Sequence, residues 1–418
     1  MGELYEWLKS LKGSPVYPGI PCEELSPELT TVTETGAADL LKVYKFDLSS
    51  LQADEFIRFF VDGVQRTAIV QELNLLSPPI PVVASHIIAG AFERENNEVR
   101  PAIIRELLVL LFPRSALMQK FGDNVPKQMY NVPIPTLDST GDFYVKASQS
   151  QLGVETNIFF VDSSITFEKT PKPSIEPSEL IAIGKLRGIA LNRISAIRRA
   201  LEVGIVMELR KKYPKDFICI DGPLARMMFL IYARLADSHF EYLSDLSDSQ
   251  KSFEFLQKVL GVVKEVEFIP RTGLEHAFNT DAINIPIFQI IDPEKMEQFR
   301  HLICCFIWIR PELRKFIPIS GTMASGLIRV DVPIPAICDY VPSWLNPNEF
   351  RPDLNNSSSS CKKLEGILKA ILRERLPLPS THSHHRLFVE LFPIAEGERI
   401  LKSRLMSHEE LRLIVERM

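Results

Sequence analysis

The segment from Phe217 to Leu224, FICIDGPL, is the part of the sequence that decides the fold class. A short run that is apolar up to its final aspartate is typical of a parallel strand buried on both faces. Gly222 and Pro223 then end this strand. The residues from Ser178 to Tyr213 contain no proline, which predicts one long helix, and Pro177 lies just before its first turn. A long helix that leads into a buried strand indicates an α/β protein.

Three segments with short connections come earlier in the chain. They are 55–62 (EFIRFFVD), 66–73 (RTAIVQEL) and 80–94 (IPVVASHIIAGAFER), and their composition and spacing predict an antiparallel meander. We expect a buried helix at 101–112 (PAIIRELLVLLF) and another strand at 157–167. The sequence therefore predicts a mixed sheet with antiparallel first strands, flanked by helices.

Helices and strands alternate after residue 221. We expect helices at 226–235 and 362–375 and strands at 261–268, 305–309 and 327–332. For the domain organisation we expect an N-terminal extension over 1–50 and one domain over 51–418, with an insertion around 101–150 and an exposed loop at 352–361 that contains NNSSSS.

Composition excludes several classes of protein. The 418 residues are 45% hydrophobic and 24% charged, close to the globular average, and the net charge of −5 excludes a chain that is basic throughout. None of the six cysteines belongs to a CxxC pair, which favours reduced thiols in a soluble cytoplasmic protein. We expect neither a signal peptide nor a membrane span. Phosphate-binding loops (GxxxxGK[ST], GxGxxG) and the HExxH and GxSxG motifs are absent.

Two aspartates stand after apolar strand segments. Asp62 follows IRFFV and precedes Gly63, and Asp221 follows FICI and precedes Gly222. Carboxylates at the ends of neighbouring strands could share Mg²⁺ or Mn²⁺, and two-metal sites cut phosphodiesters. The alternative is that Asp-Gly is a common turn dipeptide.

The predicted long helix contains a third candidate acid. Glu202 lies among apolar residues, where a carboxylate is costly to bury unless it is paired or bound to a metal. Arg198 and Arg199 lie one turn earlier and could pair with it. Glu208 has the neighbours of a solvated residue. The basic residues of this helix form either a face that follows a phosphate backbone or an ordinary solvated face: Lys185, Arg187, Arg193, Arg198 and Arg199.

These motifs together resemble the NurA nucleases, which process DNA ends with HerA-type hexameric ATPases. The resemblance rests on Asp62-Gly63 after a strand, the arginine-rich helix with its embedded glutamate, and the IDGPL segment at 220–224. It also includes GVVK at 261–264 and LIRVDVP at 327–333. The order of the motifs and the overall length fit nearly the whole chain.

The resemblance implies a ribonuclease-H-like core with family-specific insertions and a DNA nuclease that depends on Mn²⁺ or Mg²⁺. It implies 5′–3′ exonuclease and single-strand endonuclease activity, a homodimer, and a HerA-type translocase as partner. Asp62, Glu202 and Asp221 would be catalytic metal ligands, with Glu208 as the alternative to Glu202. Arg193, Arg198, Arg199 and Lys264 would contact DNA.

The C-terminal part departs from the family pattern. His384 takes the position of a catalytic histidine, with His382 and His385 as alternatives, but Leu376 stands where a tyrosine is expected. Two other functions therefore stay open: a weakly active or inactive adaptor subunit of such an ATPase complex, and a different enzyme on the same fold, such as a resolvase or an RNA-cleaving hydrolase. Convergence of Asp62, Glu202, Asp221 and His384 within metal-bridging distance would favour the nuclease.

Overall fold

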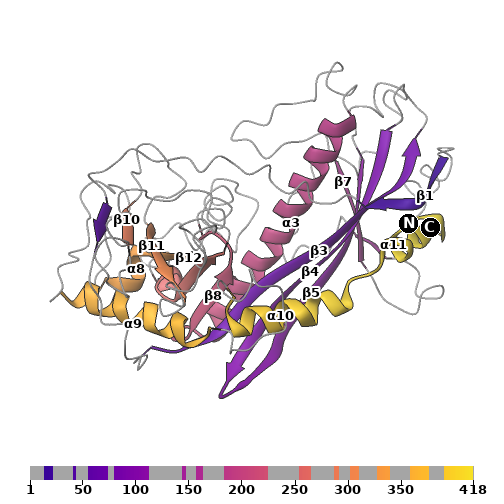
Figure 1. The fold of residues 1–418 in the computed structure, drawn as a ribbon. Coiled ribbons are helices and arrows are strands. Elements are labelled where there is room, and N and C mark those ends of the chain that lie inside the picture. Colours follow the sequence, from indigo (N-terminus) through magenta and orange to yellow (C-terminus); the bar gives the residue numbers. More distant parts are fainter. Residues whose placement is uncertain are drawn as a thin grey trace, which may run out of the picture.

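The computed structural model of the chain contains one mixed β-sheet with helices on both faces (Figure 1). It describes residues 14–21, 41–43, 55–73, 80–112, 144–146, 157–162, 183–224, 254–264, 287–290, 302–309, 327–338, 358–375 and 390–417. The described elements are β1 (Ser14–Pro21), β2 (Leu41–Val43), β3 (Ile57–Leu73), β4 (Ile80–Glu95), β5 (Glu98–Phe112), β6 (Tyr144–Lys146), β7 (Asn157–Asp162), α3 (Ile183–Lys212), β8 (Phe217–Asp221), β9 (Val259–Val263), β10 (Ile287–Ile290), β11 (Leu302–Trp308), β12 (Leu327–Pro333), α8 (Ile334–Ile337), α9 (Ser359–Arg373), α10 (Phe392–Arg404) and α11 (His408–Arg417).

The sheet combines antiparallel strands on one side of β3 with parallel strands on the other side. The strand order is β2-β10-β11-β12-β9-β8-β3-β4-β5-β7-β6, and β1 pairs with β3. β3, β4 and β5 form the predicted antiparallel meander, while β8 is parallel to β3 and β9 is parallel to β8. Two strands from the first 50 residues, β1 and β2, pair with this sheet. The α/β class and the mixed sheet are therefore as predicted.

The strand that contains Asp62 is longer than predicted. We expected two strands, 55–62 and 66–73, separated by a turn, but β3 is one strand of 17 residues that pairs with β4 through Asp62 and Gly63. The sequence prediction was wrong here because it assigned Gly63 to a turn. In the structure Gly63 lies within the strand, and residues of α3 leave no space for a side chain there.

The segment 101–112, which we expected to be a helix, is a strand. It belongs to β5, which lies between β4 and β7 and pairs with both. Leu107 to Leu111 are all buried. A strand that is covered on both faces has a continuous apolar run, which periodicity cannot distinguish from a buried helix.

Most of the later predictions agree with the structure. The helix predicted at 178–213 is α3, and the strands predicted near 217, 261, 305 and 327 are β8, β9, β11 and β12. The strand at 157–167 is confirmed as far as Asp162. α9 begins at Ser359, inside the predicted loop, because the Ser358 hydroxyl accepts a hydrogen bond from the backbone N–H of Cys361 and caps the helix. The helix predicted at 226–235 lies outside the described residues.

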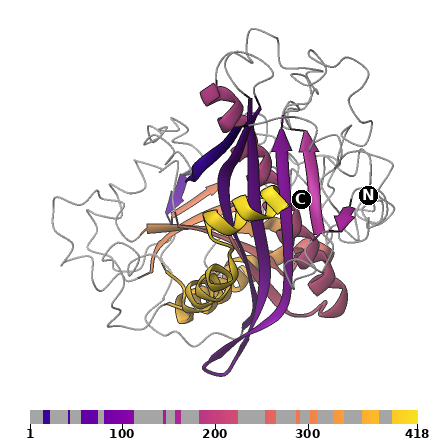
Figure 2. The same cartoon turned by 90° about the vertical axis from the view of Figure 1, so that its right-hand side faces the viewer.

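Helices cover the two faces of the sheet at different places. α3 packs against β3, β4 and β5 on one face, and its apolar residues share a core with Phe59 and Val61. On the opposite face α8 and α9 share a second core with Phe60, and α10 packs through Leu401 on Val64. Figures 1 and 2 show α10 and α11 on the side of the long strands away from α3. None of the described helices is both long enough and apolar enough to cross a membrane.

Candidate functional site

Asp62 and Asp221 lie next to each other on the same face of the sheet. β3 and β8 are parallel, and the register pairs Val61 with Ile220, so the two aspartates follow at the next position of each strand. Adjacent strands are about 4.8 Å apart. Successive side chains alternate between faces, and Val61 and Ile220 both belong to the core beneath α3. The two carboxylates therefore point to the opposite face, the one that carries α9 and α10.

The Asp62 carboxylate is buried beside other negative charges. The side chain is 7% exposed, and its Oδ1 accepts a hydrogen bond of 2.7 Å from the backbone N–H of Gly63. Burial raises the pKa of Asp62 well above its usual range, and the charges of Asp221, Glu202 and Glu398 raise it further, against an opposing effect of Lys264. In the described part of the chain no lysine or arginine forms an ion pair with Asp62, so its charge is compensated less directly than that of its neighbours.

Lys264 provides a positive charge on the same face as the two aspartates. It follows the end of β9, and its Nζ lies 2.8 Å from Asp221 Oδ2 and 3.4 Å from Glu390 Oε1. Burial alone would lower the pKa of Lys264, but Asp221 and Glu390 raise it above its usual value. The ammonium group is therefore a fixed cation and not a general base near neutral pH.

Two glutamates that the sequence analysis did not consider also belong to this cluster. Glu390 is 4% exposed, and burial raises its pKa, with Asp221 and Glu398 adding to the effect against Lys264. Glu398 lies on α10, close enough to raise the pKa of both Asp62 and Glu390, and it pairs with Lys402. Glu390 lies between Val389 and Leu391 in the sequence. A carboxylate among apolar residues is the same pattern that made Glu202 a candidate, so Glu390 could have been found in the same way.

Glu202 lies on the other face of the sheet. A Cβ added to Gly63 would stand 2.5 Å from Glu202 Oε1, and Gly63 points to the face opposite Asp62. Arg199 Nη1 donates to Glu202 Oε2 at 2.7 Å, and Arg198 Nε lies 3.7 Å from Glu202 Oε1. The structure thus brings the three predicted acids to one region of the sheet. However, the sheet separates Glu202 from Asp62 and Asp221. Glu202 forms ion pairs with arginines of its own helix, which was the alternative to metal binding.

Arg199 also supports the turn after Asp221. Its Nη1 donates to the backbone carbonyl of Asp221 at 2.8 Å. Gly222 has a φ of +121°, and a Cβ there would stand 2.5 Å from Arg199 Nη2. Burial lowers the pKa of Arg199, but the charge of Glu202 and its hydrogen bond raise it more, so the guanidinium keeps its charge. The turn therefore needs glycine both for its backbone conformation and for the approach of Arg199.

A buried ion pair between Arg329 and Asp331 on β12 also stabilises the turn after Asp221. The Asp331 carboxylate is fully buried and accepts hydrogen bonds from Arg329 Nε at 2.7 Å and from the backbone N–H of Leu224 at 3.0 Å. Gly261 on β9 lets the turn pack closely, because a Cβ there would stand 2.9 Å from the Gly222 carbonyl oxygen. Asp331 was not among the predicted site residues, although it lies in the LIRVDVP motif.

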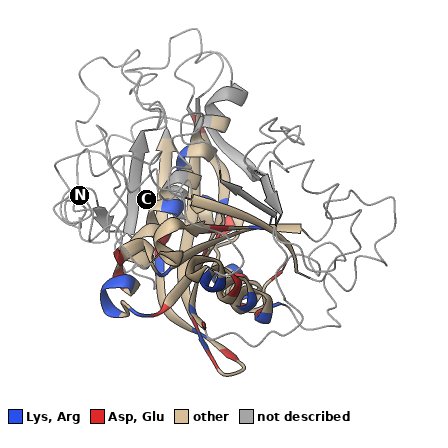
Figure 3. Cartoon of the chain, turned by 90° about the vertical axis from the view of Figure 1, so that its left-hand side faces the viewer, with Lys and Arg blue, Asp and Glu red and all other residues tan. Residues whose placement is uncertain are grey.

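The other predicted site residues are the arginines expected to contact DNA and the C-terminal histidines. Arg193 is buried in α3, and Arg198 and Arg199 are mostly buried at Glu202. Figure 3 shows basic and acidic positions interleaved over the described elements. His382, His384, His385 and Leu376 lie outside the described residues. The residues on either side of that segment, Arg375 and Leu391, form an isolated antiparallel bridge.

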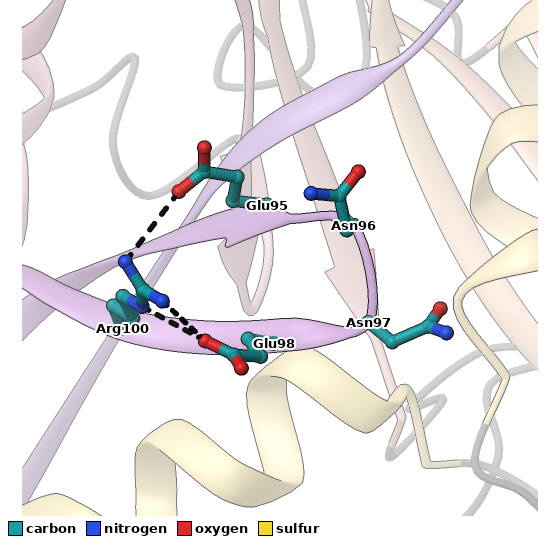
Figure 4. A pocket seen from close by; sticks show the side chains of 5 residues that line it. All are labelled: Glu95, Asn96, Asn97, Glu98 and Arg100. Carbon is teal, nitrogen blue, oxygen red and sulfur yellow. Dashed lines mark hydrogen bonds and ion pairs between the residues drawn. The ribbon is translucent and has the colours of Figure 1, made fainter.

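A separate surface pocket lies at the tip of the β4–β5 hairpin (Figure 4). Glu95, Asn96, Asn97, Glu98 and Arg100 line it, and Arg100 pairs with both glutamates. These ion pairs are exposed, and exposed pairs contribute little energy. Gly90, the partner of Asp62 in β4, is about 20 Å from Asn96 at the usual rise per residue. The pocket is therefore separate from the aspartate pair.

The aspartate pair has the donor chemistry that a hard divalent cation requires. Oxygen ligands suit Mg²⁺ and Mn²⁺, and two carboxylates one strand spacing apart repel each other unless a cation or a proton lies with them. Within the described ranges, no three His, Cys, Asp or Glu side chains are arranged so that they alone could hold a metal ion. Asp62 and Asp221 fit a cation that completes its coordination with other ligands.

A comparison with solved structures finds a structural similarity. The chain is similar to the crystal structure of the NurA nuclease from Sulfolobus solfataricus, with 13% sequence identity and a TM-score of 0.34 over 84% of this chain and 80% of that chain. No family model matches the sequence, and no curated protein matches it. A similarity of this size assigns neither residues nor an activity to this chain.

Proposed function

We propose that this protein is a metal-dependent deoxyribonuclease that hydrolyses phosphodiester bonds. The observation that carries the proposal is the pair Asp62 and Asp221, two carboxylates on one face of neighbouring parallel strands. A ribonuclease-H-like core is part of the proposal, and the antiparallel strands β3, β4 and β5 followed by the parallel strands β8 and β9 support it.

Each residue of the cluster has a role in this proposal. Asp62 and Asp221 would hold Mn²⁺ or Mg²⁺, which when bound activates water and stabilises the leaving oxygen of a phosphodiester. Lys264 places a fixed positive charge beside Asp221, where it attracts an anionic backbone. Glu202 and Arg199 act from the other face, since Arg199 holds the carbonyl of Asp221 and so orients the strand end.

The broader assignment depends on the sequence motifs. Processing of DNA ends with a HerA-type hexameric translocase, assembly as a homodimer and a catalytic role for His384 are proposed from the resemblance alone. The second candidate, an adaptor with little activity, is favoured by one observation: Lys264, Arg198 and Arg199 already neutralise Asp221 and Glu202.

A cleavage assay with matched variants tests the proposal. Purified protein is incubated with end-labelled single- and double-stranded DNA, with Mn²⁺ or with EDTA. We expect cleavage with Mn²⁺ that Asp62→Asn and Asp221→Asn abolish. The control is Asp216→Asn, which removes an aspartate that pairs with Arg58 away from the cluster. No cleavage by the parent protein, with or without a HerA-type ATPase, would favour the adaptor.

A further inference from the structure

Lys264 lies between two carboxylates on the face of the sheet that carries Asp62. Its ammonium group is 2.8 Å from Asp221 Oδ2 and within 3.5 Å of both oxygens of Glu390. Two carboxylates from different parts of the chain thus converge on one cation, as carboxylates do on a bridging metal. The Lys264 side chain is only 17% exposed, so the arrangement is enclosed.

The strands determine where the Lys264 side chain lies. Lys264 follows β9, which pairs with β8, and Val262 lies opposite Asp221. Val262 belongs to the core beneath α9, so Lys264, two residues later, points to the same face. Glu390 precedes α10 and reaches the cluster from the covering layer of helices. The ammonium group is therefore positioned by the sheet on one side and by the helical layer on the other.

The charges around Lys264 differ from those around Asp62. Asp221 and Glu390 have a lysine, Glu398 has Lys402, and Glu202 has two arginines. Among the described residues Asp62 has only the backbone N–H of Gly63. Asp221 and Glu390 share one lysine, so the carboxylates of this face can accept a further cation on the Asp62 side.

We infer that Lys264 replaces one of the two metal ions of a two-metal site, so that the chain takes up a single divalent cation between Asp62 and Asp221. This inference rests on the proposed function for the identity of the ion. The site would then hold one metal ion, and the Lys264 ammonium group would take the place of the second. The inference predicts that removal of the lysine charge allows a second metal ion to bind between Asp221 and Glu390.

Metal stoichiometry tests the inference without any measurement of activity. Mn²⁺ binding to the full chain is titrated by calorimetry, and free Mn²⁺ is followed by its electron paramagnetic resonance signal. We expect one bound Mn²⁺ per parent chain and two for Lys264→Met or, should that variant not fold, for Lys264→Gln. Lys264→Arg keeps the charge and should bind one.

Lys258→Met is the matched control. Lys258 lies at the other end of the same strand, where it pairs with Glu55 at 3.6 Å and packs over Phe217. This variant should bind one Mn²⁺. Thermal melting with Ca²⁺ gives an independent measure: Lys264→Met should melt below the parent without Ca²⁺ and gain more from Ca²⁺ than the parent does.

The outcomes separate this inference from the proposed function. Two Mn²⁺ ions on the parent, or one Mn²⁺ on both the parent and Lys264→Met, overturn the inference and leave the nuclease proposal intact. If the parent binds no Mn²⁺, the single-cation site fails and the metal-dependent nuclease proposal fails with it, whatever Lys264→Met binds.

Discussion

The Asp331 carboxylate accepts a hydrogen bond from the backbone N–H of Leu224 across 107 positions of the chain. This bond ties the turn after Asp221 to β12, and Arg329 holds the same carboxylate by two further hydrogen bonds. The orientation of one candidate metal ligand therefore depends on a buried ion pair two strands away in the sheet.

Asp331→Asn should lower the free energy of unfolding by about 3–5 kcal/mol, because it removes the carboxylate charge that pairs with the buried Arg329 guanidinium. The double variant Asp331→Leu, Arg329→Met should recover only part of this loss, since an apolar pair of similar volume replaces both charges but the backbone N–H of Leu224 loses its acceptor. Urea denaturation of the three proteins measures the difference. A single variant as stable as the parent would contradict the structural role of the pair.

Asp62→Asn should lower Mn²⁺-dependent cleavage by several orders of magnitude without loss of stability. The carboxylate is the candidate ligand, and its pKa is raised by burial and by negative neighbours, so its charge destabilises the folded state near neutral pH. The amide keeps the shape of the side chain and removes that charge. Melting temperature and cleavage are measured on the same preparation. If the variant melts lower and still cuts, Asp62 is only a structural residue.

Gly63→Ala should destabilise the protein by about 1–3 kcal/mol, since its Cβ would stand 2.5 Å from Glu202 Oε1 and 2.9 Å from Arg198 Cγ. Glu202 cannot move away freely because two arginines hold it. The matched control is Gly188→Ala on α3, where an added Cβ meets nothing within 4 Å. That variant should gain up to about 1 kcal/mol from helix propensity. Equal effects at both glycines would contradict the close packing of α3 on β3.

His86 should make stability depend on pH below neutrality. Burial lowers its pKa from 6.5 to about 4, with Arg66 adding to the effect, and its Nδ1 accepts a hydrogen bond of 3.1 Å from the backbone N–H of Met406. The unfolded chain binds the proton more tightly, so stability falls as pH falls from 6.5 towards 4, by about 3 kcal/mol in all.

His86→Asn keeps an acceptor for Met406 and removes this titration. The difference in unfolding free energy between parent and variant, measured by urea denaturation at several pH values, should change across that window. A difference that stays constant from pH 7 to pH 4 would show that His86 does not titrate in this way.

The sequence predicted both aspartates from the apolar segments before them, but only Asp221 ends its strand. Asp62 lies inside β3, and its position beside Asp221 follows from the parallel register of β3 and β8. The face on which Glu202 lies could not be predicted, because it depends on how α3 packs across β3. The helix predicted at 101–112 failed because a strand buried on both faces has no period.

Glu390 shows a different limit of sequence reasoning. It lies 126 positions from Lys264, and no local pattern pairs the two residues before the sheet and α10 are assembled. The apolar neighbours of Glu390 were visible, but the same pattern occurs wherever a carboxylate is paired with a distant cation.

The long strands β3 and β4 also determine when the protein can finish folding as it is synthesised. β4 and β5 follow β3 directly in the chain, but Met406, which donates a hydrogen bond to His86 on β4, lies 320 positions after His86. At about 5–20 residues per second, a ribosome needs roughly 16–64 s to add that length. Until Glu390 and Leu401 have been made, the nascent sheet lacks one of the two carboxylate partners of Lys264 and the helical cover of Val64. The cluster therefore assembles only after Glu398 has been made, and until then the apolar faces of the emerging sheet are open to aggregation.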